Sequence, residues 1–194
     1  MTYYNKITES TRTGAFDTNP TNWRSIATSA TLVMLISLLN QCTAIYQCAC
    51  VFTAILLMVN AKMLNTGSKQ AYKYIATGVL LSLPIYMLSG SLSNGLVLAS
   101  LVSLLISSFA SIYIGNLVKD SYSLPVVLVI SLLAAASIDG LLMSAYFAIQ
   151  TNFSFYKVIS IFNRELFFKA VYSMASALTI YYLGIYGKRK SKMV

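Results

Sequence analysis

The chain has 194 residues, of which 57% are hydrophobic and only 10% are charged. Soluble domains carry about 25% charged residues, so this composition indicates an integral membrane protein. The net charge of +9 does not point to nucleic acid, because the basic residues lie between and beyond the apolar runs and form no stripe interleaved with aromatics. The absence of histidine excludes histidine-based catalysis and histidine metal ligands.

Residues 1–24 are polar and lack the apolar core of a signal peptide. We expect a polar cytoplasmic tail here, with Trp23 and Arg24 as an anchor at the membrane interface. Residues 188–194 are expected to form a basic cytoplasmic tail. The segment between them, 25–187, is expected to form one transmembrane domain.

Six apolar runs divide this domain. Each is near the ~20 residues needed to cross ~30 Å of hydrocarbon. The predicted fold is all-α, a polytopic membrane protein with six transmembrane helices. The runs cover about residues 25–40, 42–61, 71–90, 93–118, 124–149 and 166–187.

The second run contains all three cysteines, Cys42, Cys48 and Cys50. Their apolar setting and the lack of a CxxC motif favour small packing residues over a metal or redox site. No metal or other cofactor is expected. Asn60 ends this run, where it can cap the helix or hydrogen-bond to a neighbouring helix, and it is a candidate for substrate binding.

The third run contains Pro84, which predicts a kink. The fourth carries small residues at intervals of four, which form one narrow stripe on a helix. The stripe predicts close helix packing, with a substrate-facing groove as the alternative. Its members are Ala99, Ser103, Ser107, Ser111 and Gly115.

The fifth run contains Asp139, which lies about 22 Å of helix from Leu124 and about 15 Å from Ile149. A charge at such depth costs roughly 2.5–3.5 kcal/mol on insertion scales. Asp139 therefore needs hydrogen-bond partners or a wet cavity. We interpret it as a substrate-binding residue, with a structural carboxyl bonded to neighbouring Ser or Tyr side chains as the alternative.

Glu165 and Lys169 open the sixth run with an i, i+4 spacing, which places them on one helix face. They form either an interfacial salt bridge at the start of the helix or part of a binding site. Lys169 is expected to reach Asp139, so that the three ionisable groups converge on one outward-opening pocket. The preceding segment, 150–165, is expected to be an external loop that lies in the interface or covers the pocket.

The distribution of basic residues predicts the orientation. With six spans, eleven Lys and Arg residues lie on the side of the two termini and three on the other. This asymmetry predicts that both termini are cytoplasmic. The three on the outer side are Lys157, Arg164 and Lys169.

Four stretches resemble one family in their order and spacing. They are "VFTAILLMVNAKMLNTGSKQAYKYI", "ASLVSLLISSFASIYIGNLVKD", "LPVVLVISLLAAASIDGLLMSAYFAI" and "VISIFNRELFFKAVYSMASALTIYYLGIYGKRK". Together they are similar to the queuosine precursor transporters, also described as vitamin uptake transporters, over about residues 51–190. The chain resembles a divergent member, since that family usually has an acidic residue near Asn60 and an arginine pair near Tyr72 and Lys73.

The resemblance implies six helices arranged like the substrate-binding subunits of energy-coupling-factor transporters, in a bacterial inner membrane. It also implies uptake of 7-deazaguanine bases. Such a base presents adjacent N–H donors, which the carboxylate of Asp139 or Glu165 could accept while an aromatic ring stacks on the base.

Three functions remain open at this point. The first is a stand-alone transporter of a small purine-like or vitamin-like molecule. The second is a substrate-binding subunit with a separate energising ATPase module, and the third is a non-transport scaffold of the cell envelope. An enzyme is not expected, because no nucleophile–base pair, nucleotide-binding motif or zinc motif is present. The expected partners are the substrate, the lipid bilayer and either the ATPase module or a second copy of the chain.

Overall fold

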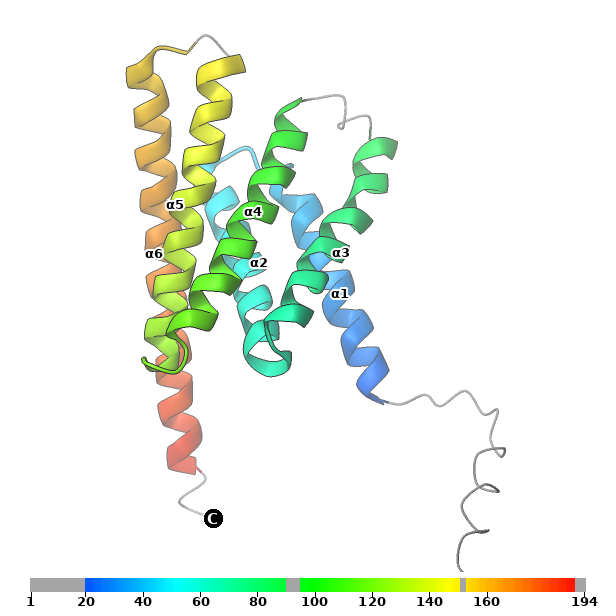
Figure 1. Ribbon diagram of the computed structural model, residues 1–194, viewed down its shortest axis with the longest axis vertical. Coiled ribbons are helices and arrows are strands. Elements are labelled where there is room, and N and C mark those ends of the chain that lie inside the picture. Colours follow the sequence, from blue (N-terminus) through cyan, green and yellow to red (C-terminus); the bar gives the residue numbers. More distant parts are fainter. Residues whose placement is uncertain (1–19, 90–94, 151–152, 191–194) are drawn as a thin grey trace, which may run out of the picture.

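The computed structural model of the chain describes residues 20–89, 95–150 and 153–190. Within these ranges the protein is all-helical, with six helices (Figure 1). The predicted all-α fold is therefore confirmed, whereas most of the predicted tail at 1–24 lies outside the described residues. The helices are α1 (Pro20–Leu39), α2 (Ile45–Thr66), α3 (Ser68–Leu88), α4 (Gly95–Val118), α5 (Leu124–Gln150) and α6 (Phe155–Lys190).

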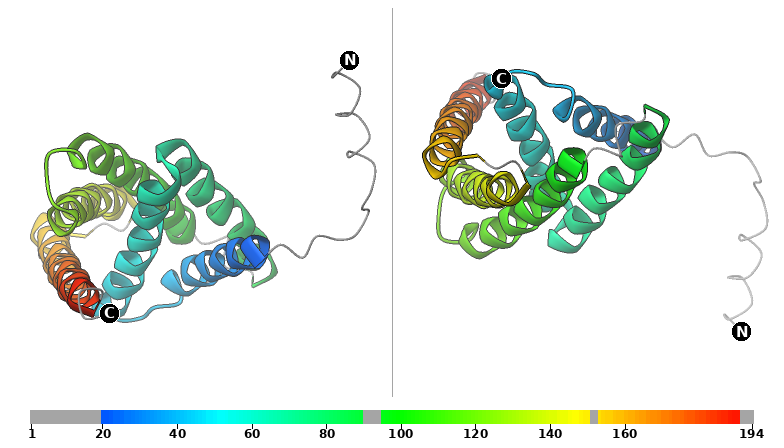
Figure 2. Two further views of the ribbon diagram at one scale, coloured as in Figure 1. Left: turned by 90° about the horizontal axis from the view of Figure 1, so that it is seen from below. Right: turned by 90° about the horizontal axis from the view of Figure 1, so that it is seen from above.

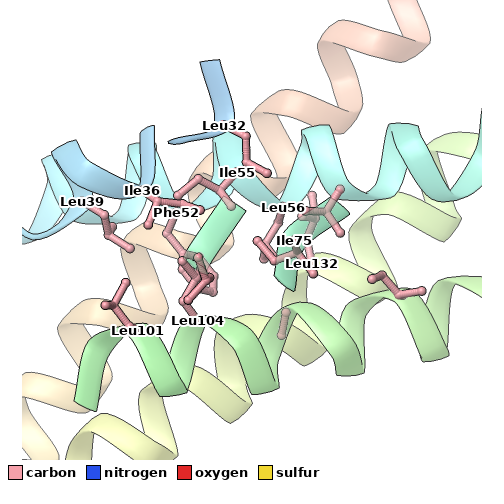
Figure 3. Packing of buried hydrophobic residues seen from close by; sticks show 14 of the residues in the cluster. Leu32, Ile36, Leu39, Phe52, Ile55, Leu56, Ile75, Leu101, Leu104 and Leu132 are labelled. Carbon is pink, nitrogen blue, oxygen red and sulfur yellow. The ribbon is translucent and has the colours of Figure 1, made fainter. Parts of the chain in front are cut away.

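Helix α2 lies at the centre of the bundle and packs against each of the other five helices. Viewed from its two ends, the bundle has α2 between the α1/α3 pair and the α5/α6 pair (Figure 2). Apolar side chains from five helices meet around α2 and form the core (Figure 3). They include Leu32 and Ile36 of α1, Phe52, Ile55 and Leu56 of α2, Ile75 of α3, Leu104 of α4 and Leu132 of α5.

Helices α3, α4 and α5 match the predicted runs to within three residues at each end, whereas α1 begins five residues before its run and α2 ends five residues after its own. Pro84 lies inside α3, and the helix continues through it to Leu88. A single residue, Gly67, joins α2 to α3 with φ 89° and ψ 163°. This backbone conformation is essentially restricted to glycine, so the sharp reversal between the two helices depends on a residue without a side chain.

The sixth helix differs from the prediction. It begins at Phe155 rather than at residue 166, so most of the predicted external loop at 150–165 is in fact the start of α6. The segment is helical because it packs against α5: Val158 is buried, and a Cβ added to Gly140 would lie only 2.9 Å from the Phe162 ring. The sequence of this segment mixes polar and apolar residues and contains no long apolar run, so the segment was not predicted to belong to the helix.

Four helices, α2 to α5, are long and apolar enough to cross a membrane. Helix α1 contributes a shorter apolar stretch, Ser25–Leu39. Large apolar side chains also point away from the core, including Leu80 of α3, Leu98 of α4 and Leu141 of α5, each more than half exposed. Exposed apolar surface of this extent indicates contact with lipid.

The two ends of the bundle differ in their connections. Helix α1 begins and α6 ends at the same end, which also holds the α2–α3 and α4–α5 connections (Figure 1). The opposite end holds the α1–α2 connection, the start of α4, the end of α5 and the start of α6.

The small-residue stripe of α4 packs inside the bundle. Ser103, Ser107 and Ser111 are at most 1% exposed, and Gly115 is buried against Asn60 and Met63 of α2. Helix α4 has its most extensive contact with α5. The prediction of close helix packing is therefore confirmed, and the alternative, a substrate-facing groove along the stripe, is not what the structure shows.

Candidate functional site

A pocket of about 230 Å³ opens between α1, α2, α4, α5 and α6. Its lining includes Asn40, Cys42 and Thr43 of the α1–α2 connection, so the pocket lies toward that end of the bundle. Most of its lining surface is apolar, and polar side chains from several elements contribute the rest. The lining includes Leu39, Ile45, Phe52, Leu96, Met143, Phe147 and Ile161, with Asn40, Cys42, Thr43, Cys48, Ser100, Asp139, Glu165 and Lys169 as its polar or weakly polar members.

Three ionisable side chains form one cluster in this pocket, which we call the ion cluster: Asp139, Glu165 and Lys169. The Lys169 ammonium donates to Oδ2 of Asp139 and to Oε1 of Glu165. Ser103 Oγ donates to Oδ1 of Asp139 over 2.5 Å. The expected convergence of the three charged residues is therefore confirmed.

Lys169 is the most enclosed member of the cluster, at 2% side-chain exposure. Two of its three N–H donors meet the carboxylates. Its Nζ atom also lies 4.3 Å from the centroid of the Phe52 ring, in a cation–π contact. The ammonium is thus surrounded by the protein's own groups.

The two carboxylates face the pocket more openly than the ammonium. The side chain of Glu165 is 17% exposed and that of Asp139 is 8% exposed. With all three groups ionised, one ammonium faces two carboxylates and the cluster carries a formal charge of −1. An excess charge in a mostly buried site is costly unless a further partner compensates it.

Local sequence and packing place these groups. Glu165 and Lys169 share one face of α6 through their i, i+4 spacing. They lie about 15 Å and 21 Å along the helix from Phe155. The predicted location at the helix N-terminus is therefore wrong, and the helix dipole does not disfavour Lys169. Gly140, beside Asp139, admits the Phe162 ring and so brings α5 close to α6.

Asn60 does not join the ion cluster or line the pocket. It is fully buried, and its Nδ2 donates to Ser111 Oγ over 2.8 Å and to the Leu56 carbonyl over 2.9 Å. Its Oδ1 has no hydrogen-bond partner among the described residues. The structure therefore favours the helix–helix hydrogen bond that the sequence left open for this residue.

The sequence did not show how several residues come together at the site. Ser103 belongs to the small-residue stripe, but nothing in its spacing shows that it bonds to Asp139. Phe52 and Phe147 lie within apolar runs rich in aromatic residues. Asn40 is held at the pocket by Tyr86, whose hydroxyl accepts from Asn40 Nδ2 over 3.0 Å and donates to the Ile36 carbonyl over 2.5 Å.

The prediction that the cysteines are small packing residues holds for Cys48, which packs against the hydrophobic core. Cys42 and Cys48 line the pocket, and the Cys48 thiol donates to the Cys42 carbonyl over 3.6 Å. Cys50 is exposed. Within the described part of the chain, no group of three or more His, Cys, Asp or Glu side chains is placed to hold a metal ion.

No protein-family model matches the chain, and no curated protein or solved structure matches it either. The function is therefore argued from the geometry of the site, a small and largely apolar cavity lined by two carboxylates.

Proposed function

We propose that this chain is a membrane transporter that imports a small purine-like or vitamin-like molecule through the pocket at the ion cluster. The specific substrate proposed is a queuosine precursor, a 7-deazaguanine base. The observation that carries the proposal is the pocket itself. It is a cavity inside a helix bundle, with charged groups that are costly to place in a membrane and that face the cavity.

The size of the pocket supports a small substrate. Sites for drug-sized ligands measure about 300–1,000 Å³, so a cavity of about 230 Å³ suits a single heterocycle. Phe147 and Met143, which are partly exposed, line it and offer an apolar surface to a flat ring. A carboxylate beside them can accept two adjacent N–H donors of a base edge.

We further propose that all six helices cross a bacterial inner membrane and that both termini are cytoplasmic. The positions of the basic residues support this topology. Lys62, Lys69, Lys73 and Lys119 lie at the α2–α3 and α4–α5 connections, at the end of the bundle where α1 begins and α6 ends. The pocket lies toward the other end, so in this topology it opens outward.

A stand-alone transporter is the form that we favour over a substrate-binding subunit of an energy-coupling-factor transporter. A stripe of small residues such as that of α4 lets a second helix approach closely, so in a substrate-binding subunit it would be a surface for a partner helix. Ser103, Ser107 and Ser111 are buried against the chain's own helices, so the stripe gives no support to a partner. No observation favours an envelope scaffold.

The test is uptake of a labelled 7-deazaguanine base by cells that express the wild type or Asp139→Asn, normalised to the inserted protein. Glu165 still pairs with Lys169 in the variant, so we expect normal insertion. Losing one charge-assisted hydrogen bond costs about 1.5–3 kcal/mol, or roughly ten- to a hundredfold in affinity. We therefore expect uptake to fall to near background.

The matched control is Asp120→Asn, which removes the same charge from an exposed residue outside the pocket. Its uptake should equal that of the wild type. Equal normalised uptake by Asp139→Asn would refute the binding role of Asp139 and leave it as a structural carboxyl.

A further inference from the structure

The hydrogen-bond inventory of the ion cluster restricts what the pocket can hold. Among the described residues, Lys169 is the only cationic side chain in the lining, and the two carboxylates and the Phe52 ring surround its ammonium. At 2% exposure it offers almost no surface to an incoming ligand. A ligand anion in this pocket would therefore meet carboxylates rather than a free cation.

The carboxylates of the cluster, unlike the ammonium, can still form hydrogen bonds with a ligand. Each carboxylate has about four lone-pair sites. Asp139 uses its two oxygens on Lys169 and on Ser103, and Glu165 uses Oε1 on Lys169. Oε2 of Glu165 accepts no described hydrogen bond, and Glu165 is the most exposed of the three side chains. The group that the cluster offers to a ligand is thus a hydrogen-bond acceptor, in a site that carries excess negative charge.

A bare metal cation does not fit this arrangement. Ca²⁺ takes six to eight oxygen ligands and Mg²⁺ takes six in octahedral geometry. The described lining adds the side-chain oxygens of Asn40, Thr43 and Ser100 to two carboxylates that already bind Lys169, and most of its surface is apolar. The cavity calls instead for a ligand with a charged N–H group at one end and an apolar or aromatic body at the other.

We infer that the pocket selects a small organic cation with a flat or apolar body and excludes carboxylate-bearing molecules of the same size. This inference rests on the proposed function and narrows its substrate class, the purine-like or vitamin-like molecules, to members that carry a positive charge and no acid group. The bound cation neutralises the excess charge of the ion cluster through Glu165 and Asp139.

The experiment measures binding to the purified full chain in lipid nanodiscs with three probes of nearly the same shape. Benzamidine is a planar cation, benzamide its neutral counterpart and benzoate its anionic counterpart. We expect benzamidine to bind at least tenfold more tightly than benzamide, because its amidinium forms charge-assisted hydrogen bonds. Benzoate should not bind.

The variant Glu165→Gln keeps the shape of the side chain and removes its charge. It should weaken benzamidine binding about ten- to a hundredfold and change benzamide binding little. Asp120→Asn, with the same charge change outside the pocket, should leave both unchanged. If Glu165→Gln folds poorly, the comparison of the three probes on the wild type still tests the inference.

Three results would overturn the inference. They are benzoate binding as tightly as benzamidine, no benzamidine binding at millimolar concentration, and NaCl alone stabilising the protein against unfolding as much as benzamidine does. These results are separate from the uptake test. A chain that imports substrate yet prefers the anionic probe contradicts only the charge selectivity, and a chain that binds benzamidine but imports nothing contradicts only the transport function.

Discussion

Lys169 shows how one residue can organise a site inside a membrane bundle. Its ammonium joins α6 to α5 through Asp139 and closes a contact within α6 through Glu165, while the Phe52 ring of α2 covers it. Without the ammonium, two carboxylates would share a nearly buried site. The stability of the cluster therefore depends on the cation more than on either acid.

This dependence predicts the effect of Lys169→Met, which keeps the apolar stem and removes the charge. Breaking a buried ion pair by removing one partner costs about 3–5 kcal/mol, because the remaining charge is left uncompensated. We expect Lys169→Met to lower the free energy of unfolding by about this amount, measured by thermal or denaturant unfolding in lipid nanodiscs.

The double variant Lys169→Met with Asp139→Asn provides the control. It removes one acid together with the cation, so we expect it to be more stable than Lys169→Met alone. A double variant as unstable as the single one would show that Lys169 contributes packing rather than compensating charge.

At the scale of elements, the contact between α5 and α6 brings Asp139 of α5 together with Glu165 and Lys169 of α6. Gly140 allows this contact, since a Cβ there would lie 2.9 Å and 3.0 Å from two atoms of the Phe162 ring. Any side chain at this position would push the start of α6 away from α5, and Glu165 and Lys169 lie on the same helix.

We therefore expect Gly140→Ala to destabilise the protein. Overpacking costs about 1–3 kcal/mol, while the better helix propensity of alanine returns up to about 1 kcal/mol. The steric effect should dominate, with a net loss of about 1 kcal/mol or more in the free energy of unfolding.

Gly95→Ala is the matched control for this prediction. Among the described residues, the added Cβ would meet only the hydroxyl oxygen of Tyr146, at 3.2 Å, which is the far end of a side chain. Its stability should stay close to that of the wild type. A Gly140→Ala protein as stable as this control would mean that the Phe162 ring moves aside at little cost.

At the scale of the whole molecule, the orientation of the bundle in the membrane decides to which side the pocket opens. Lys119 lies at the α4–α5 connection, at the end where α1 begins, and Lys157 lies in the first turn of α6 at the other end. Both residues are exposed. They therefore report on opposite sides of the proposed membrane.

Cysteine labelling tests this topology in a background with Cys42, Cys48 and Cys50 changed to serine. A membrane-impermeant thiol reagent added to intact cells should label Lys157→Cys and should reach Lys119→Cys only after permeabilisation. The reverse pattern would mean that the protein is inserted in the opposite orientation, with the pocket on the cytoplasmic face. Labelling of both residues from outside would rule out the proposed topology.

The apolar runs of the sequence by themselves determined the all-α class and most helix boundaries, because a span needs a minimum apolar length whatever surrounds it. They did so to within three residues at both ends for α3, α4 and α5. The start of α6 at Phe155 could not be predicted in this way. There the helix is stabilised by side-chain contacts with α5, such as Phe162 on Gly140, and these leave no long apolar run.

The sequence likewise determined that Asp139 needs a partner, since an unpaired charge at that depth is costly, and the i, i+4 spacing placed Glu165 beside Lys169. Only the tertiary structure decided the rest. Ser103 and Phe52 reach the cluster, and Asn60 is directed to Ser111 instead, because helix packing sets which faces meet. Periodicity shows that residues share a face but does not show what that face contacts.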